Sequence, residues 1–192
     1  MFRPVRVTAP AMLPISVADV KKLIRIDFDD DDDAIEQNIQ SAVDHYEGWN
    51  GILGICLVEQ EWRQDFEGFC RLLQLPLGPF ISLSKVTWRN ADGVDHELDA
   101  SVYSVCVDDS GSVSVRFSSS FVWPAPVAEF APVSIFYKAG FPIIENKSTV
   151  PQDIRTAIVA RVQMLFDQQG TVSAEIIERM EAGLVQKWQR LA

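Results

Sequence analysis

The stretch WNGILGICLVEQEWRQDF, residues 49–66, marks a change in the spacing of the apolar residues. Up to Gly51 they recur every three or four positions, which is the spacing of one face of a helix. From Leu57 to Phe66 the spacing moves toward two, which is typical of a strand with one buried face. We therefore expect a helix to end at Gly51 and β structure to follow it.

Two helices are predicted upstream of Gly51. Ser16 is a suitable N-cap for the first helix, with Asp19 three residues later as in a capping box, and this helix should end near Arg25. The acidic run Asp29–Asp33 stands at the N-terminus of the second helix, where the helix dipole favours negative charge. The predicted apolar faces are Val17, Val20, Leu23 and Ile24 in the first helix, and Ile35, Ile39, Ala42, Val43, Tyr46 and Trp49 in the second.

An antiparallel sheet is predicted between residues 52 and 138. Turn signals at residues 91–93 and 109–111 favour hairpins. No helical segment separates the strands, so the crossovers that parallel strands need are excluded by length. We expect a small β-sandwich or curled sheet. The predicted strands are residues 57–66, 72–75, 86–89, 102–107, 113–117 and 133–137.

The C-terminal region is predicted to return to helix. Pro151 suits the first position of a third helix, which should end before Gly170. A fourth helix is expected from Ser173 onward, and Gly183 weakens it by about 1 kcal/mol relative to Ala. The predicted apolar faces are Ile154, Ala157, Ile158, Val162, Leu165 and Phe166 in the third helix, and Ile177, Met180, Leu184, Trp188 and Leu191 in the fourth.

These elements predict an α+β fold. Residues 14–51 and 150–192 should form a bundle of about four helices. Residues 52–141 should form an antiparallel β-sandwich-like domain inserted between helices two and three. Because the insertion separates the helices in sequence, helices from both ends of the chain must pack together.

The composition excludes several classes of protein. Of the 192 residues, 47% are hydrophobic and 23% are charged, which allows a core without disulfides or metals. The net charge of −10 argues against binding nucleic acid over a broad basic surface. We expect a soluble, unexported protein, because no apolar run suits a membrane span and no leader is recognisable. Cys56, Cys70 and Cys106 are widely spaced and are interpreted as reduced packing residues.

No pattern indicates an active site, and we predict neither enzymatic activity nor a cofactor or metal. The run Asp29–Asp33 lacks the glycine and the glutamate that an EF-hand calcium loop needs. His45 and His96 have no nucleophile at a recognisable spacing. Three acids within residues 95–99 include a conceivable glycosidase pair, but acids beside a hairpin more often face solvent.

Two apolar segments are candidates for contacts with partners. The proline-rich loop of residues 121–132 contains Phe121, Trp123 and Phe130, and such loop aromatics either bind a partner or cover one end of a sheet core. The last predicted helix carries the stripe Leu184, Trp188 and Leu191. Both interpretations stay open for both segments.

Several segments together carry a family resemblance. They are residues 15–27, the acidic run with residues 35–46, and residues 57–62, 75–81, 86–93, 123–124, 136–141 and 150–155. In this order they resemble the phage head-tail connector (adaptor) proteins, most closely the head-tail adaptor of the gene transfer agents of alphaproteobacteria. The resemblance extends over residues 14–168, and the segment after Gly170 matches least.

The resemblance implies a structural head-tail connector of a phage-like particle, either a gene transfer agent or a prophage. It implies a ring, expected to be dodecameric, that docks below the portal, extends the DNA channel and joins the head to the tail. The implied partners are the portal protein ring, a tail-side stopper protein and further copies of the chain, while DNA passes through without specific binding and no membrane is involved. The implied location is the bacterial cytoplasm during assembly and then the head-tail junction.

The candidate site residues follow from this role. An acidic wall repels phosphates and eases the sliding of DNA, so Asp29, Asp30, Asp31, Asp32 and Asp33 are hypothesised to face the channel. Contacts in a ring join two different faces of a subunit. The candidate portal or subunit contacts are Phe121, Trp123, Phe130, Leu184, Trp188 and Leu191. The alternative is a non-catalytic β-sandwich module that binds carbohydrate or protein, with stacking on Phe121 and Trp123.

Overall fold

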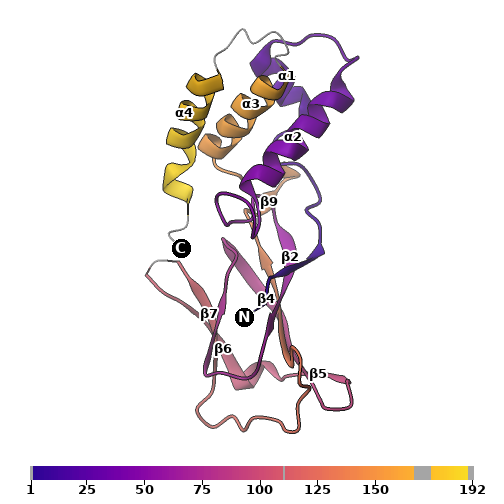
Figure 1. Cartoon of the computed structure of the whole chain (residues 1–192), viewed down its shortest axis with the longest axis vertical. Coiled ribbons are helices and arrows are strands. Elements are labelled where there is room, and N and C mark those ends of the chain that lie inside the picture. The colour runs from indigo at the N-terminus through magenta and orange to yellow at the C-terminus, as the bar shows by residue number, and fades with distance from the viewer. Residues whose placement is uncertain (1, 110, 167–173, 190–192) are drawn as a thin grey trace. The chain divides into compact units, whose positions relative to one another are not determined.

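The computed structural model describes residues 2–109, 111–166 and 174–189. It divides into two compact units, each built from two segments of the chain (Figure 1). We call residues 11–58 and 141–192 the helical unit, and residues 1–10 and 59–140 the β unit. The fold is α+β with antiparallel sheets between the second and third helices, as predicted.

The helical unit contains four α-helices, two from each segment. They are α1 (Val17–Ile24), α2 (Asp32–Tyr46), α3 (Gln152–Phe166) and α4 (Ala174–Val185), and a 3-10 turn, η2 (Gln186–Trp188), follows α4. Helix α3 packs against both α2 and α4, so helices from the two ends of the chain meet as expected. Among the described residues, no helix is long and apolar enough to cross a bilayer.

The predicted ends of α1 and α3 agree closely with the structure. The Ser16 side chain accepts a hydrogen bond from the Asp19 backbone N–H at the N-cap of α1, and Arg25 ends this helix in the left-handed region with φ of 62°. Helix α3 begins one residue after Pro151, whose carbonyl accepts the first helical hydrogen bond from Arg155. The caps are therefore set by local sequence.

Each of the four predicted apolar faces has an exposed member. Trp49 is 44% exposed, because α2 ends at Tyr46 and not at Gly51 as expected, and Leu165 of α3 is 42% exposed.

In the other two faces, a charged residue is buried instead. Leu23 of α1 is 58% exposed, whereas the stem of Lys21 is buried with Val20. In α4, Met180 is 48% exposed, and the buried positions include Glu181 and Val185. In each of these two helices, a buried charged residue, Lys21 or Glu181, occupies a position that the apolar spacing assigns to a hydrophobic residue.

The core of the helical unit draws on all four helices and on the segment that follows α2. Its largest fully buried side chains include Tyr46 of α2, and Met12, Leu13 and Phe141 pack against the core from the linking segments. The unit also contains a two-stranded ribbon of β9 (Ile143–Ile144) and β10 (Lys147–Ser148). Buried members of the core include Val20, Ile35, Ile39, Val43, Leu53, Leu57, Ile154, Ile158, Val162 and Val185.

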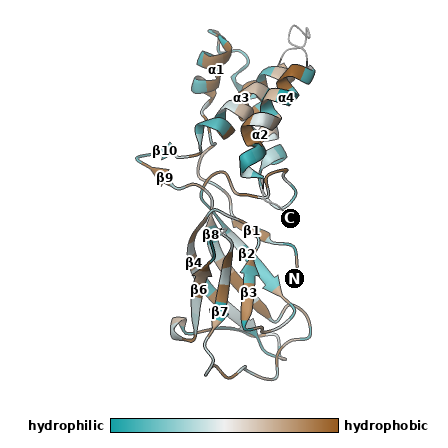
Figure 2. Ribbon diagram, turned by 90° about the vertical axis from the view of Figure 1, so that its left-hand side faces the viewer, coloured by the Kyte–Doolittle hydropathy of each residue, from teal (hydrophilic) through white to brown (hydrophobic). Residues whose placement is uncertain are grey.

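The β unit is a sandwich of two antiparallel sheets (Figure 2). The five-stranded sheet has the order β1 (Val5–Thr8), β2 (Gln60–Phe66), β8 (Val133–Ala139), β4 (Phe80–Arg89) and β5 (Asp95–Glu97). The three-stranded sheet has the order β3 (Leu72–Leu75), β7 (Val113–Phe117) and β6 (Tyr103–Val107), and a short turn, η1 (Ala100–Val102), precedes β6. Strands β1 and β5 are not among those predicted.

The sandwich core follows the alternation of the strands. On β2 and β8, every second residue is buried, in pairs such as Trp62 with Tyr137 and Gln64 with Ile135. On the smaller sheet, Val115 pairs with both Leu73 and Val105. The inner residues of the two sheets therefore form a second core that is separate from that of the helical unit.

Candidate functional site

The acidic run is organised by one lysine. Lys21 Nζ lies 2.5 Å from Asp29 Oδ1 and 2.6 Å from Asp32 Oδ1, and the Lys21 side chain is 11% exposed. These hydrogen bonds raise the pKa of Lys21 and hold the pKa of Asp29 below its ordinary value. Part of the charge of the run is thus used to join α1 to the first turn of α2.

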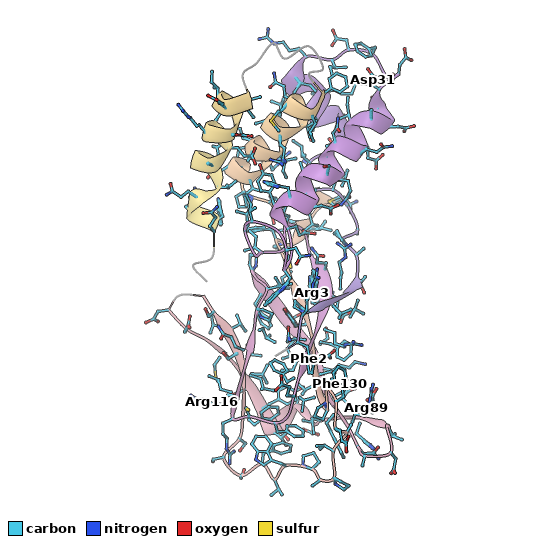
Figure 3. The ribbon with its side chains drawn as sticks, viewed as in Figure 1. Phe2, Arg3, Asp31, Arg89, Arg116 and Phe130 are labelled. Atoms are coloured by element: carbon cyan, nitrogen blue, oxygen red, sulfur yellow. The ribbon has the colours of Figure 1, made fainter. Side chains whose placement is uncertain are left out.

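The other acids of the run stand at the start of α2. Asp31 is its N-cap but its side chain makes no capping hydrogen bond, and Asp30 and Asp33 are exposed. Figure 3 shows Asp31 at the end of the helical unit where α2 begins. In the part of the chain that the structure describes, no group of three or more His, Cys, Asp or Glu residues could hold a metal ion. Facing a DNA channel stays a prediction for these acids.

Helix α4 is held by a buried ionic cluster. Glu181 is 5% exposed, and its Oε1 lies 3.1 Å from Arg161 Nη1 on α3 and 3.5 Å from His45 Nε2 on α2. Burial lowers the pKa of His45, the charge of Arg161 adds to this shift, and Glu181 opposes it. Burial and the hydrogen bond to Glu181 raise the pKa of Tyr46. The cluster ties α4 to helices from both segments of the unit.

The apolar stripe of the last helix packs within the helical unit. Leu184 and Trp188 are partly buried against its core, and the Trp188 ring meets Phe141 edge-on at a centroid distance of 5.9 Å. Lys187 forms an ion pair with Asp153 of α3. Leu191 lies outside the described residues. A contact of this stripe with the portal or a neighbouring subunit stays a prediction.

The aromatic loop contains a compact cluster at one end of the sandwich. Trp123 stacks on Phe69 with ring centroids 5.1 Å apart, and it meets Phe117 and Phe121 edge-on at 5.5 and 5.4 Å. The Arg71 guanidinium lies 5.3 Å from the centroid of Trp123. Because Phe121 and Trp123 pack against each other and against the inner residue Phe117, this arrangement gives little support to an open sugar-stacking platform.

The exposed apolar part of the loop lies elsewhere. Phe130 is 72% exposed and Val122 is 84% exposed. Phe130 meets Phe2 at a centroid distance of 4.8 Å, and Figure 3 shows the two side by side in the β unit. The loop thus has some side chains packed inward and others exposed. Val122 belongs to the exposed apolar surface and Phe2 lies beside Phe130, although the sequence pattern singles out neither Val122 nor Phe2.

The acids near the β4–β5 hairpin have structural partners. Arg89 donates two hydrogen bonds to Asp95, at 2.7 and 3.0 Å, and this lowers the pKa of Asp95. Asp99 caps η1 by accepting from the Ser101 backbone N–H. His96 stacks on Trp88 with ring centroids 4.8 Å apart. This set resembles hairpin stabilisation more than a pair of acids directed into a cleft.

The three cysteines differ in their surroundings. All are free thiols, and Cys56 is buried, Cys106 is half-buried and Cys70 is exposed. The interpretation as packing residues is therefore wrong for Cys70, because it lies in the exposed connection between β2 and β3. Cys70 therefore places a free thiol on the surface of the β unit.

Comparisons with known proteins identify the class to which this fold is similar. Residues 14–60 match the family model described as "Phage gp6-like head-tail connector protein". The whole chain matches a chain of "Neck of empty GTA particle computed with C6 symmetry" with a TM-score of 0.79 and 17% identity, covering 100% of this chain and 97% of that one. Among curated proteins, no sequence matches this chain.

Two further solved structures are similar over the same extent. A chain of "Virion of native gene transfer agent (GTA) particle" matches with a TM-score of 0.75 and 18% identity. A chain of "Neck of native GTA particle computed with C12 symmetry" matches with a TM-score of 0.76 and 17% identity. Each match covers 100% of this chain and 97% of the other. The resemblance seen in the sequence is thus confirmed, by the family model over residues 14–60 and by the fold over the whole chain.

Proposed function

We propose that this chain is a structural head-tail connector of a phage-like particle, either a gene transfer agent or a prophage. The observation that carries the proposal is that the complete two-unit fold, including the inserted sandwich, matches chains of GTA necks over 100% of its length. The match of residues 14–60 to the connector family model supports it independently, because that match rests on sequence. The chain would be made in the bacterial cytoplasm and function at the head-tail junction.

A ring of identical subunits suits this role. One of the similar necks was computed with C12 symmetry and another with C6 symmetry, which is compatible with twelve copies. We propose a dodecamer that binds the portal ring on one side and a tail-side stopper protein on the other. DNA passes through the ring without specific binding.

The acidic run is proposed to repel DNA from the channel wall. Asp30, Asp31 and Asp33 are the members that Lys21 does not engage through an ion pair, so they supply the field if they face the lumen. Changing these three to Asn should slow DNA delivery while particles still form. Normal delivery by such particles would contradict this part of the proposal. Changing Glu145, an exposed acid outside the run, to Gln is the matched control.

The contacts with the portal and the stopper are proposed to use the outward apolar residues. Phe130 is the best candidate among those expected, because it is 72% exposed. Phe121 and Trp123 would act by shaping the loop, since they are packed in the aromatic cluster. Leu184 and Trp188 would act indirectly too, by packing the end of α4 against the core of the helical unit. Leu191 is a candidate by sequence alone.

The decisive experiment is co-sedimentation of the purified full-length chain with the portal ring encoded near it. Binding that survives washing, with a ring of added density below the portal in electron micrographs, is the expected result. Absence of binding to intact portal rings would contradict the connector role. A glycan-binding assay on the same preparation tests the alternative module, and specific binding lost in Trp123→Ala but not in Phe130→Ala would favour that alternative.

A further inference from the structure

Strand β6 leaves apolar side chains uncovered on the core side of its sheet. Val105 and Val107 pair with Val115 and Val113, which are fully or almost fully buried, so all four side chains project to the same face. Nevertheless Val105 is 38% exposed and Val107 is 62% exposed. The described residues of the β unit therefore leave the inner face of β6 partly uncovered at Val105 and Val107, whereas Tyr103 on the same face is half-buried against Phe117.

Strand β1 forms a second exposed edge, on which Val5 and Val7 alternate with Arg6 and Thr8. All four of its residues are exposed, with Val5 at 44% and Val7 at 48%, and it pairs only with β2 within its sheet. Natural proteins rarely leave apolar edge strands open, because such edges invite pairing with other chains. Two open edges on one subunit are what a ring built from head-to-tail contacts requires.

The two edges lie on opposite sides of the sandwich. Strand β1 is the first strand of the five-stranded sheet and β5 is the last. Strand β6 begins near the end of β5, since only residues 98–102 separate the two strands in the chain. Figure 2 agrees, with β6 on the side of β4 and β1 on the other side. An edge on each side allows one copy to follow the next in the same orientation.

The charges at the two edges are complementary. Residues 1–13 carry Arg3 and Arg6 and no acid. The end of β6 leads into Asp108 and Asp109, and no Lys or Arg occurs between residues 90 and 115. Apolar and charged residues also alternate with the same spacing, as Arg3, Val5 and Val7 on one edge and Asp109, Val107 and Val105 on the other when the segments run antiparallel. Such a match places valine beside valine and arginine beside aspartate.

We propose that the β6 edge of one copy packs against the β1 edge of the next copy, and that this contact closes the ring. The inference rests on the proposed function, in which several copies form a ring. The register of β1 with β2 shifts between Arg6 and Thr8, and such an irregularity opposes a long hydrogen-bonded ladder on the free side of β1. The contact is therefore made mainly by the side chains of the matched residues.

Cysteine cross-linking in assembled rings tests the contact. In a background with Cys70→Ser and Cys106→Ser, the double variant Val5→Cys with Val107→Cys should give a ladder of cross-linked copies after oxidation or a short bismaleimide. Each single variant should stay monomeric on a denaturing gel, and a mixture of the two single variants should give dimers only. This pattern is specific to a contact between two different faces. The pair Val5→Cys with Val122→Cys, which uses the 84% exposed loop residue, is the control that should not link.

Charge exchange gives an independent measurement. Arg3→Asp or Asp109→Arg alone should reduce the yield of rings, and the two together should restore it. Both residues are exposed, so neither change should disturb folding. Failure of the double exchange to restore assembly, or cross-linked dimers of a single-cysteine variant, would overturn the proposal.

The outcomes also separate this inference from the connector role. The cross-linking is performed on the portal-bound chain and on the concentrated chain alone. Portal-bound rings without any ladder would overturn the β1–β6 contact and leave the connector role intact. Absence of portal binding would contradict the connector role, and the ladder from the concentrated chain alone would still decide whether the two edges meet.

Discussion

Glu181 on α4 and Arg161 on α3 form an ion pair in which the glutamate side chain is only 6% exposed and Arg161 Nη1 lies 3.1 Å from Oε1. Arg161 Nη1 also lies 3.4 Å from the second carboxylate oxygen, Oε2. A buried carboxylate is costly unless it is paired. The position of α4 therefore depends on a charge that the helix buries, in addition to its apolar contacts.

Glu181→Gln should loosen α4. The change weakens a charge-assisted hydrogen bond and leaves the charge of Arg161 without its counter-ion, at an expected cost of about 2 kcal/mol. Hydrogen exchange of the α4 amides should become faster, while the β unit keeps its protection. Glu178→Gln, at an exposed position of the same helix, is the control. Equal exchange in both variants would show that the buried ion pair does not hold the helix.

The stability of the helical unit should fall as the pH is lowered through the range in which His45 titrates. The pKa of His45 is lowered in the folded protein, so the unfolded chain binds the proton more readily and protonation favours unfolding. The loss should begin near the ordinary value of 6.5 and end at the lower pKa of the folded state. Thermal unfolding at pH values from about 7 down to about 5 measures it.

Two variants assign this pH dependence. His45→Gln should flatten the curve in that range, whereas His96→Gln, which removes a ring stacked on Trp88 in the β unit, should leave it unchanged for the helical unit. Acids with a lowered pKa, such as Asp29 and Asp95, affect the stability only at pH values below about 3.8, which lies outside the range of His45. An unchanged slope in His45→Gln would contradict the assignment.

Trp123→Ala and Phe130→Ala should separate the packing and contact roles of the loop. Trp123 packs against three aromatic rings, so its truncation should destabilise the β unit by about 2–3 kcal/mol. Phe130 is 72% exposed and should cost less than about 1 kcal/mol. Urea unfolding followed by circular dichroism measures both. Loss of portal binding in Phe130→Ala without loss of stability is the expected signature of a contact residue.

Two glycine substitutions should have opposite effects. Gly183 lies within α4 with open space around its Cβ position, so Gly183→Ala should stabilise the helical unit by about 0.5–1 kcal/mol. A Cβ at Gly51 would overlap the backbone of Tyr46 and Glu47, so Gly51→Ala should destabilise the unit. Melting temperatures of the two variants measure the difference. A lower melting temperature for Gly183→Ala would contradict the first expectation.

The sequence predicts the order and type of the long elements well. Periods of 3.6 and 2 identify the four helices and most strands because each element buries one face. Strand β1 is not predicted from the sequence, because its four residues are all exposed and Pro4 precedes them. Strands β5, β9 and β10 are not predicted either, because they are too short to show a periodic spacing of apolar residues. The first half of β4 is also missed, because none of residues 80–85 is buried.

The candidate site is less predictable for a physical reason. Glu181 is assigned to solvent by its polarity, and only the fold reveals Arg161 and His45 beside it. Lys21 shows the same limitation, since its partners Asp29 and Asp32 belong to the next helix. Val105 and Val107 read as ordinary inward residues of a strand, because alternation cannot tell whether the opposite sheet reaches far enough to cover them.

The division of the helical unit into two segments has a consequence for synthesis on the ribosome. More than 100 residues separate the end of α2 at Tyr46 from the start of α3 at Gln152. At typical elongation rates this delay lasts roughly 5–20 s, during which the apolar faces of α1 and α2 wait for their partner. We expect the β unit to fold as an independent domain in that time, and the acidic run beside α2 to keep the waiting segment from aggregating.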